Sequence, residues 1–264
     1  MKVYMVTDLE GVAGVVSFDL QTGQDCKYYD AARRLLTAEV NAAVDGLLEA
    51  GVEEVIVWDG HGPGGIYFED LHPAARLLHG RPMAPWKVRN EVTRTCDVCV
   101  IVGQHAMAGT AGGTLNHTQS SKVIDHIKLN GKCIGELGQI ALYQGAMGQP
   151  VFFLTGDEAA CREAEELIGG ITTVAVKQGL SRTCAVTLSA AEARRRIREG
   201  AKLAVRRHKE KPVAPLVWPG PYVLEKRFFH TETADGAAQQ PGAERVDSQT
   251  VRFTSDNVMD VIYR

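Results

Sequence analysis

The chain has 264 residues, enough for one large α/β domain or for a core domain with a smaller appendage. Its composition, 45% hydrophobic and 23% charged, is typical of a soluble globular protein, and its net charge of -3 excludes a strongly basic surface for nucleic acid or anionic lipid. No apolar run approaches the roughly 20 residues of a membrane-spanning helix. From the charge and from this absence we expect neither a nucleic-acid partner nor a membrane partner.

The first 180 residues alternate strands and helices, which predicts an α/β fold with a mostly parallel sheet in a three-layer core. Strands are expected where short apolar runs end in glycine-rich turns, and helices where apolar residues recur at intervals of three or four. Asp157 and Ser189 are suitable N-caps for two of the helices. The expected elements are strand 2–7, helix 29–51, strand 53–59, strand 97–103, helix 135–150, strand 151–157, helix 157–169, strand 172–178 and helix 190–208.

The sequence changes character after about Pro212, where prolines become frequent. Alternating apolar and polar residues in 222–229 and 249–255 then predict half-exposed antiparallel strands, with 231–244 as a long turn or loop. We therefore predict a metal-binding α/β core over residues 1–185 and a smaller C-terminal α+β region, residues 186–264, packed on that core.

Metal-capable side chains follow three of the predicted strands, namely Asp8 and Glu10, then Asp59 and His61, then His105. In an open parallel sheet, ligand sites form beyond the carboxyl ends of the strands. An ionised carboxylate pair at such an edge needs a cation, hydrogen-bond donors or open water. Because imidazole nitrogen suits zinc, the two histidines would complete a mixed nitrogen and oxygen ligand set.

Simpler interpretations compete with this metal site. The acid pair also fits a solvated turn or a helix N-cap, and each histidine taken alone fits a hydrogen-bonded structural residue. Glu136 opens a predicted helix, where an acid stabilises the helix dipole, and His117 lies in a polar loop. The glycine-rich stretch at 60–65 matches neither phosphate-binding fingerprint, so we do not expect a nucleotide site.

The six cysteines are scattered, and no secretory leader precedes the first predicted strand. We therefore expect free thiols and a cytoplasmic protein. Cys96 and Cys99 have C-x-x-C spacing, but Cys99 falls within an apolar strand and no second such pair exists, so buried packing is the better interpretation.

Six segments carry a family resemblance. In chain order they are MKVYMVTDLEGVAGV, VWDGHG, GQHAMAGT, NHT, GELG and AVKQGLSR. Together they strongly resemble the zinc-dependent D-aminopeptidases of the DppA type, the dipeptide-transport-operon aminopeptidases. The resemblance runs in order from residue 1 to about residue 190 and continues weakly into the tail.

The resemblance implies two zinc ions per subunit. In the family pattern the ligands correspond to Asp8, Glu10, His61, His105 and Glu136, with the aspartate bridging the two ions. The proposed catalytic histidine of the family corresponds to His117. The resemblance also implies a homodecamer whose active sites face an internal chamber, which only small or unfolded peptides can enter.

The expected activity is that of a metalloprotease, a hydrolase that cleaves the N-terminal peptide bond of short peptides, with D-alanine-type residues at the N-terminus by resemblance alone. A two-metal phosphoesterase or another binuclear metallohydrolase is the alternative enzyme, since the same residue types serve that chemistry. A metal-stabilised assembly or peptide-binding module is the non-enzymatic alternative. Lys177 and Arg182 are candidates for binding a peptide carboxylate or for an exposed or interface role, and Asp59 for orienting a ligand histidine or stabilising a turn.

Overall fold

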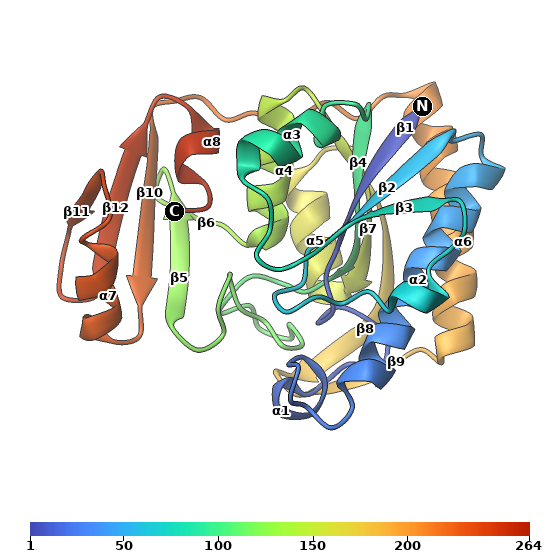
Figure 1. The fold of residues 1–264 in the computed structure, drawn as a ribbon, viewed down its shortest axis with the longest axis horizontal. Coiled ribbons are helices and arrows are strands. Elements are labelled where there is room, and N and C mark those ends of the chain that lie inside the picture. Colours follow the sequence, from blue (N-terminus) through green and yellow to red (C-terminus); the bar gives the residue numbers. More distant parts are fainter.

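Two β-sheets, each with its own hydrophobic core, make up the computed structural model, which describes residues 1–264 (Figure 1). The larger sheet has seven strands in the order β3-β2-β1-β4-β7-β8-β9. All its neighbouring pairs are parallel except the last, in which β9 is antiparallel to β8. Its strands are β1 (Lys2–Thr7), β2 (Glu54–Asp59), β3 (Ala75–Leu78), β4 (Val98–Gln104), β7 (Val151–Asp157), β8 (Thr172–Ser181) and β9 (Cys184–Thr187).

Helices cover both faces of this sheet. Figure 1 shows α2 (Tyr29–Glu49) and α6 (Ala190–Glu210) on one face, and α3 (Trp86–Thr93), α4 (Glu136–Ala146) and α5 (Glu158–Leu167) on the other. The central strands β4 and β7 are buried along their whole length because both faces are covered, which explains why each begins with a run of apolar residues. The expected three-layer core with a mostly parallel sheet is confirmed. Asp157 and Ser189 are the N-caps of α5 and α6, with side chains that accept hydrogen bonds from the first turn.

The smaller sheet is antiparallel and has the order β11-β12-β10-β5-β6. Residues of β10 alternate between buried and half-buried positions, as the sequence predicted. Its strands are β5 (Ile124–Leu129), β6 (Lys132–Cys133), β10 (Tyr222–Phe228), β11 (Ala243–Arg245) and β12 (Thr250–Ser255), and the short helices are α1 (Phe18–Gln21), α7 (Thr231–Ala237), α8 (Val258–Val261) and the 3-10 helix η1 (Phe68–Asp70).

The structure differs from the expected division at residue 185 in two places. Helix α6 lies in the larger unit, packed along α2 and β8, because its buried stripe of small and aliphatic side chains needs a helical partner. Strands β5 and β6 lie in the smaller unit, where β5 pairs with β10 almost a hundred residues later in the chain. Such a non-local pairing leaves no local pattern in the sequence. No helix of the structure is both long and apolar enough to cross a membrane.

The expected loop over 231–244 contains secondary structure. Its first half forms α7, and Ala243–Arg245 forms the edge strand β11. Ala234 is fully buried in the core of the smaller unit. Packing of this alanine against the sheet therefore overrides the turn-forming composition of the segment.

Contact between α2 and α6 depends on a glycine. A Cβ atom added to Gly46 would lie 2.2 Å from the carbonyl oxygen of Arg198, so no side chain fits between the two helices at this point. We predict that Gly46→Ala lowers the free energy of unfolding by about 1–3 kcal/mol, as overpacking does. Gly236→Ala in α7 is the matched control, because its Cβ meets nothing within 4 Å and alanine favours a helix. Thermal unfolding of both variants measures the difference, and equal midpoints would contradict the prediction.

Candidate metal centre

The strand order brings the predicted ligands together. Strands β2, β1 and β4 are neighbours in the parallel sheet, so the residues that follow them meet at one edge. Asp8 and Glu10 follow β1, His61 follows β2 and His105 follows β4. Glu136 is the first residue of α4, which brings its carboxylate to the same edge.

Asp8 lies at the centre of the group. Its Oδ1 is 3.3 Å from His61 Nδ1, and its Oδ2 is 3.1 Å from His105 Nε2. One carboxylate oxygen therefore faces each histidine. Glu10 Oε2 lies 3.1 Å from the same nitrogen of His61, and Glu136 Oε1 lies 3.5 Å from the same nitrogen of His105.

Backbone carbonyls fix the orientation of both histidines. His61 Nε2 donates to the carbonyl of Thr22 at 2.9 Å, and His105 Nδ1 donates to the carbonyl of Ala106 at 2.9 Å. A carbonyl oxygen only accepts, so the ring nitrogen facing it carries the proton. In the neutral ring, the nitrogen facing the carboxylates then presents a lone pair, which is the arrangement that metal-binding histidines show.

Two buried polar atoms at the centre have no hydrogen-bond partner, His105 Nε2 and Glu10 Oε2. His105 Nε2 lies near a carboxylate oxygen of Asp8, and Glu10 Oε2 lies near Nδ1 of His61, but neither pair has the alignment that a hydrogen bond requires. Leaving such atoms unsatisfied costs about 1–3 kcal/mol each or more when charged. Divalent cations bound to these two atoms would remove this cost, and the set of imidazole nitrogens and carboxylate oxygens fits zinc.

Burial and neighbouring opposite charges shift the pKa values of the residues at the centre in opposite directions. Burial raises the pKa of Asp8, but His105 and His61 outweigh it and hold that pKa well below its usual range. Burial lowers the pKa of His105, but Asp8 and Glu136 outweigh it and raise that pKa well above its usual range. Protons on the histidines and a metal ion therefore compete for the same lone pairs.

His117 lies at the side of the centre, on the loop between β4 and β5. Its ring stacks on that of His105 with centroids 4.0 Å apart, and its Nε2 is 3.7 Å from Glu136 Oε1. Its Nδ1 donates to the carbonyl of Leu115 at 2.8 Å, so Nε2 is the free nitrogen. Burial, followed by the positive charge of His105, lowers the pKa of His117 and favours the neutral ring.

Lys177 of β8 binds the backbone of the loop that follows β1. This lysine is 3% exposed, and its Nζ donates to the carbonyls of Glu10 and Val15. Burial lowers the pKa of Lys177 to about 8. Gly103 allows the loop to approach β4 closely, because it has φ +81° and an added Cβ would lie 2.0 Å from the carbonyl oxygen of Asp8. The backbone of the acid pair is thus fixed on two sides.

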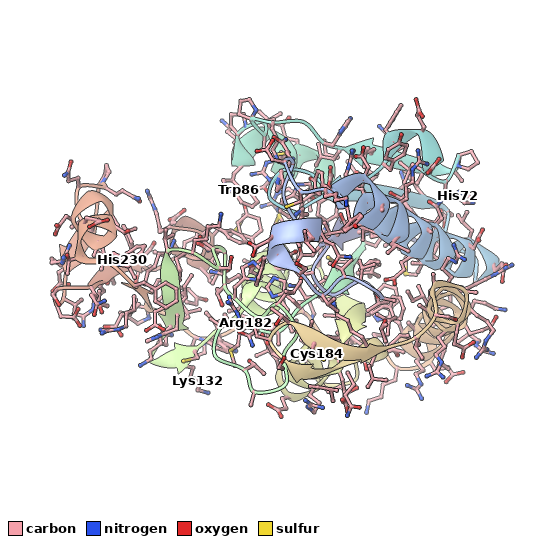
Figure 2. The ribbon with its side chains drawn as sticks, turned by 90° about the horizontal axis from the view of Figure 1, so that it is seen from below. His72, Trp86, Lys132, Arg182, Cys184 and His230 are labelled. Carbon is pink, nitrogen blue, oxygen red and sulfur yellow. The ribbon has the colours of Figure 1, made fainter.

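The structure shows the contacts of three further residues for which the sequence left two interpretations open. Lys177 is buried beneath the loop and therefore does not face a substrate. Asp59 accepts a hydrogen bond from the backbone of Gly65 at 2.6 Å, which stabilises the turn after β2. Arg182, which lies near Cys184 in Figure 2 where β8 turns into β9, donates to the carbonyl of Asn116 at 3.3 Å beside the His117 loop.

Two hollows adjoin the centre. A polar basin of about 500 Å³ is lined by Glu10, His61 and His117, among others, and a smaller recess of about 160 Å³ extends toward Trp58, Trp86 and Tyr263. The sequence reasoning missed Gln119, whose backbone N–H donates to Glu136 Oε1 at 2.7 Å. It also missed the aromatic residues, which come from segments with no local pattern that links them.

Comparisons with known proteins agree along the whole chain. The model of the peptidase family M55, described as D-aminopeptidase, matches residues 1–264. A D-aminopeptidase of Bacillus subtilis (strain 168) is 34% identical over 262 residues, which are 98% of this chain and 93% of that protein. The structure of the Zn-dependent D-aminopeptidase DppA from Bacillus subtilis, a self-compartmentalizing protease, is similar with a TM-score of 0.89 and 32% identity, covering 100% of this chain and 94% of that one.

Proposed function

Because the chain belongs to the M55 family of D-aminopeptidases, we propose that it is a two-zinc aminopeptidase that removes D-amino acids from the N-terminus of short peptides. The resemblance identified from the six sequence segments is thereby confirmed. The observation that carries the proposal is the convergence on Asp8, with one of its oxygens toward each histidine and two unpartnered polar atoms beside it.

The distances from Asp8 to the two histidines support the two ligand sets of the family pattern. Asp8 Oδ1, Glu10 and His61 would hold one zinc ion, and Asp8 Oδ2, His105 and Glu136 would hold the second. When bound, a zinc pair polarises the scissile carbonyl and lowers the pKa of water from about 15.7 to roughly 7. The protein supplies the rest by fixing the side chains: carbonyls orient both histidines, and Gln119 holds Glu136.

His117 provides a proton-transfer group next to the ligands. Its Nδ1 is tied to the carbonyl of Leu115, so a proton enters or leaves the ring at Nε2, on the side of Glu136. The neutral ring favoured by burial accepts a proton and then donates it to the leaving amine or to a developing oxyanion. His117 is therefore the proposed catalytic residue.

Charged side chains line part of the basin. Asp19 and Asp25 lie at its rim, and Lys122 is the one lysine among its lining residues, with no arginine. Asp19 and Asp25 are exposed, and their negative charge favours the approach of a protonated peptide to this side of the basin.

We also propose a homodecamer in the cytoplasm. The Bacillus subtilis relative is described as self-compartmentalizing. In this chain Leu180 and Val186 on the hairpin β8–β9 are 64% and 60% exposed, as apolar residues of a subunit interface are in an isolated chain. All six cysteines are free thiols, two of them exposed, which fits a reducing compartment.

The proposal is tested with zinc-reconstituted protein and a panel of D-Ala and L-Ala dipeptides. We expect hydrolysis of the D-Ala dipeptides, slower hydrolysis of the L-Ala dipeptides, and loss of both with a chelator. Zinc added back after removal of the chelator restores the rate. If p-nitrophenyl phosphate is hydrolysed and no peptide is, the protein is instead a two-metal phosphoesterase.

Metal content provides a second prediction. We expect about two zinc ions per chain by elemental analysis, and Asp8→Asn to lose both because each ion shares this carboxylate. Glu136→Gln is expected to lose about one zinc ion, because Glu136 lies near His105 but not near His61. Asp19→Asn, at the basin rim, is the control and keeps both. One ion or none in an active wild-type preparation would disprove the two-ion centre.

The role of His117 provides a third prediction. His117→Ala is expected to keep its zinc, because the two ligand sets are complete without it, and to lose turnover by about 10²–10⁴-fold, the usual size of acid–base catalysis. His230→Ala is the control, since this exposed histidine is the N-cap residue of α7 in the smaller unit and lies away from Arg182 in Figure 2. A wild-type kcat in His117→Ala would remove this residue from the mechanism.

A further inference from the structure

The carboxylates of the metal centre stand between the basin and the recess. Asp8, Gly60, Gln119 and Glu136 line both hollows, so a peptide bound at the centre reaches into both. The basin is about three times larger, and most of its lining is polar or glycine. The recess differs in chemistry as well as in size.

Five of the eleven residues that line the recess are apolar or aromatic. They are Val6, Trp58, Trp86, Ile140 and Tyr263. The remaining lining residues besides the four shared ones are Thr7 and Gln104, which are polar but uncharged. A charged side chain placed here would lose its hydration without gaining an opposite charge, except at the carboxylates themselves.

Aromatic contacts fix the positions of the tryptophan and tyrosine side chains that line the recess. Trp86 stacks on Tyr263 with ring centroids 5.0 Å apart, and it meets Trp58 edge-on at 6.1 Å. The guanidinium of Arg89 lies 3.7 Å from the centroid of the Trp86 ring, and Arg89 in turn donates to the carbonyl of Ala84 at 2.8 Å. The recess is therefore formed before any ligand binds, as specific small-molecule pockets usually are.

We propose that the recess binds the side chain of the N-terminal residue of the peptide, and that it selects an apolar side chain of leucine or phenylalanine size. This assignment rests on the proposed aminopeptidase function. An aminopeptidase must place one residue on one side of the scissile carbonyl and the remaining peptide on the other. The small recess fits the single residue, and the open basin fits the remainder.

Size supports the choice of side chain. A volume of about 160 Å³ is close to that of the apolar cavity of about 150 Å³ that binds benzene in a protein core. A methyl group would leave most of the recess empty, whereas an isobutyl or benzyl group would fill it. Each added methylene in a fitted apolar pocket raises kcat/KM by roughly tenfold or more.

The test compares p-nitroanilides of D-Ala, D-Leu, D-Phe and D-Lys on the zinc-loaded protein. We expect kcat/KM for D-Leu and D-Phe to exceed that for D-Ala by about tenfold or more, and that for D-Lys to be the lowest. Trp86→Ala opens the wall and is expected to lower the D-Leu to D-Ala ratio of kcat/KM by at least about tenfold. Trp218→Ala, on a tryptophan outside both hollows, is the matched control and keeps the wild-type ratio.

A second variant tests the recess independently, in case Trp86→Ala fails to fold. Ile140→Phe fills the recess from α4 instead of opening it, and it is expected to lower the same ratio, with zinc content as the check of folding. If both variants change all substrates equally, or if the wild type prefers D-Lys, the recess is not the side-chain subsite although the aminopeptidase function stands. If the wild type hydrolyses no aminoacyl substrate or peptide at all, the proposed function fails and the subsite fails with it.

Discussion

The burial of Asp8 between two histidines is the interaction on which the rest of the site depends. An ionised carboxylate that is 8% exposed is stable only when opposite charge or donors surround it. Here each of its oxygens faces an imidazole whose other nitrogen is tied to a backbone carbonyl. The fold thus holds five polar side chains at one sheet edge in an arrangement that suits a cation, and protons on the two histidines supply the opposite charge when no cation is bound.

Parallel topology explains why these side chains meet. Strand β1 lies between β2 and β4, so the segments after all three leave the sheet at the same edge and in adjacent positions. Close approach of the loops follows from Gly103, which brings β4 against the carbonyl of Asp8, and from Lys177, which binds the same loop from β8. Substitution at Gly103 or Lys177 would act on the proposed ligands Asp8 and Glu10 through the backbone.

Local patterns in the sequence were sufficient for five strands of the large sheet, β1, β2, β4, β7 and β8, and for the metal-capable residues that follow three of them. Strands β3 and β9 were not predicted, and Glu136 was selected as a ligand only through the family resemblance. The N-caps Asp157 and Ser189 were equally local signals. What could not be predicted depends on distant pairing: β5 joins β10, α6 returns to α2, and Tyr263 reaches Trp86 from the C-terminal end. Lys177 shows the limit in another way, since its charge predicted a surface or ligand-binding residue and only the tertiary structure shows that it is buried.

The smaller sheet contributes to the active site as well as to the fold. Lys226 of β10 donates to Gln119 Oε1 at 2.8 Å, and the backbone of Gln119 holds Glu136 at the metal centre. Tyr263, which follows α8, forms part of the recess wall. The side-chain subsite that we infer is therefore built from both units of the chain, with metal ligands from the larger sheet and α4 on one side and a C-terminal aromatic residue on the other. A change at Tyr263 would then alter substrate selection, whereas a change at Lys226 would act on Glu136 through Gln119.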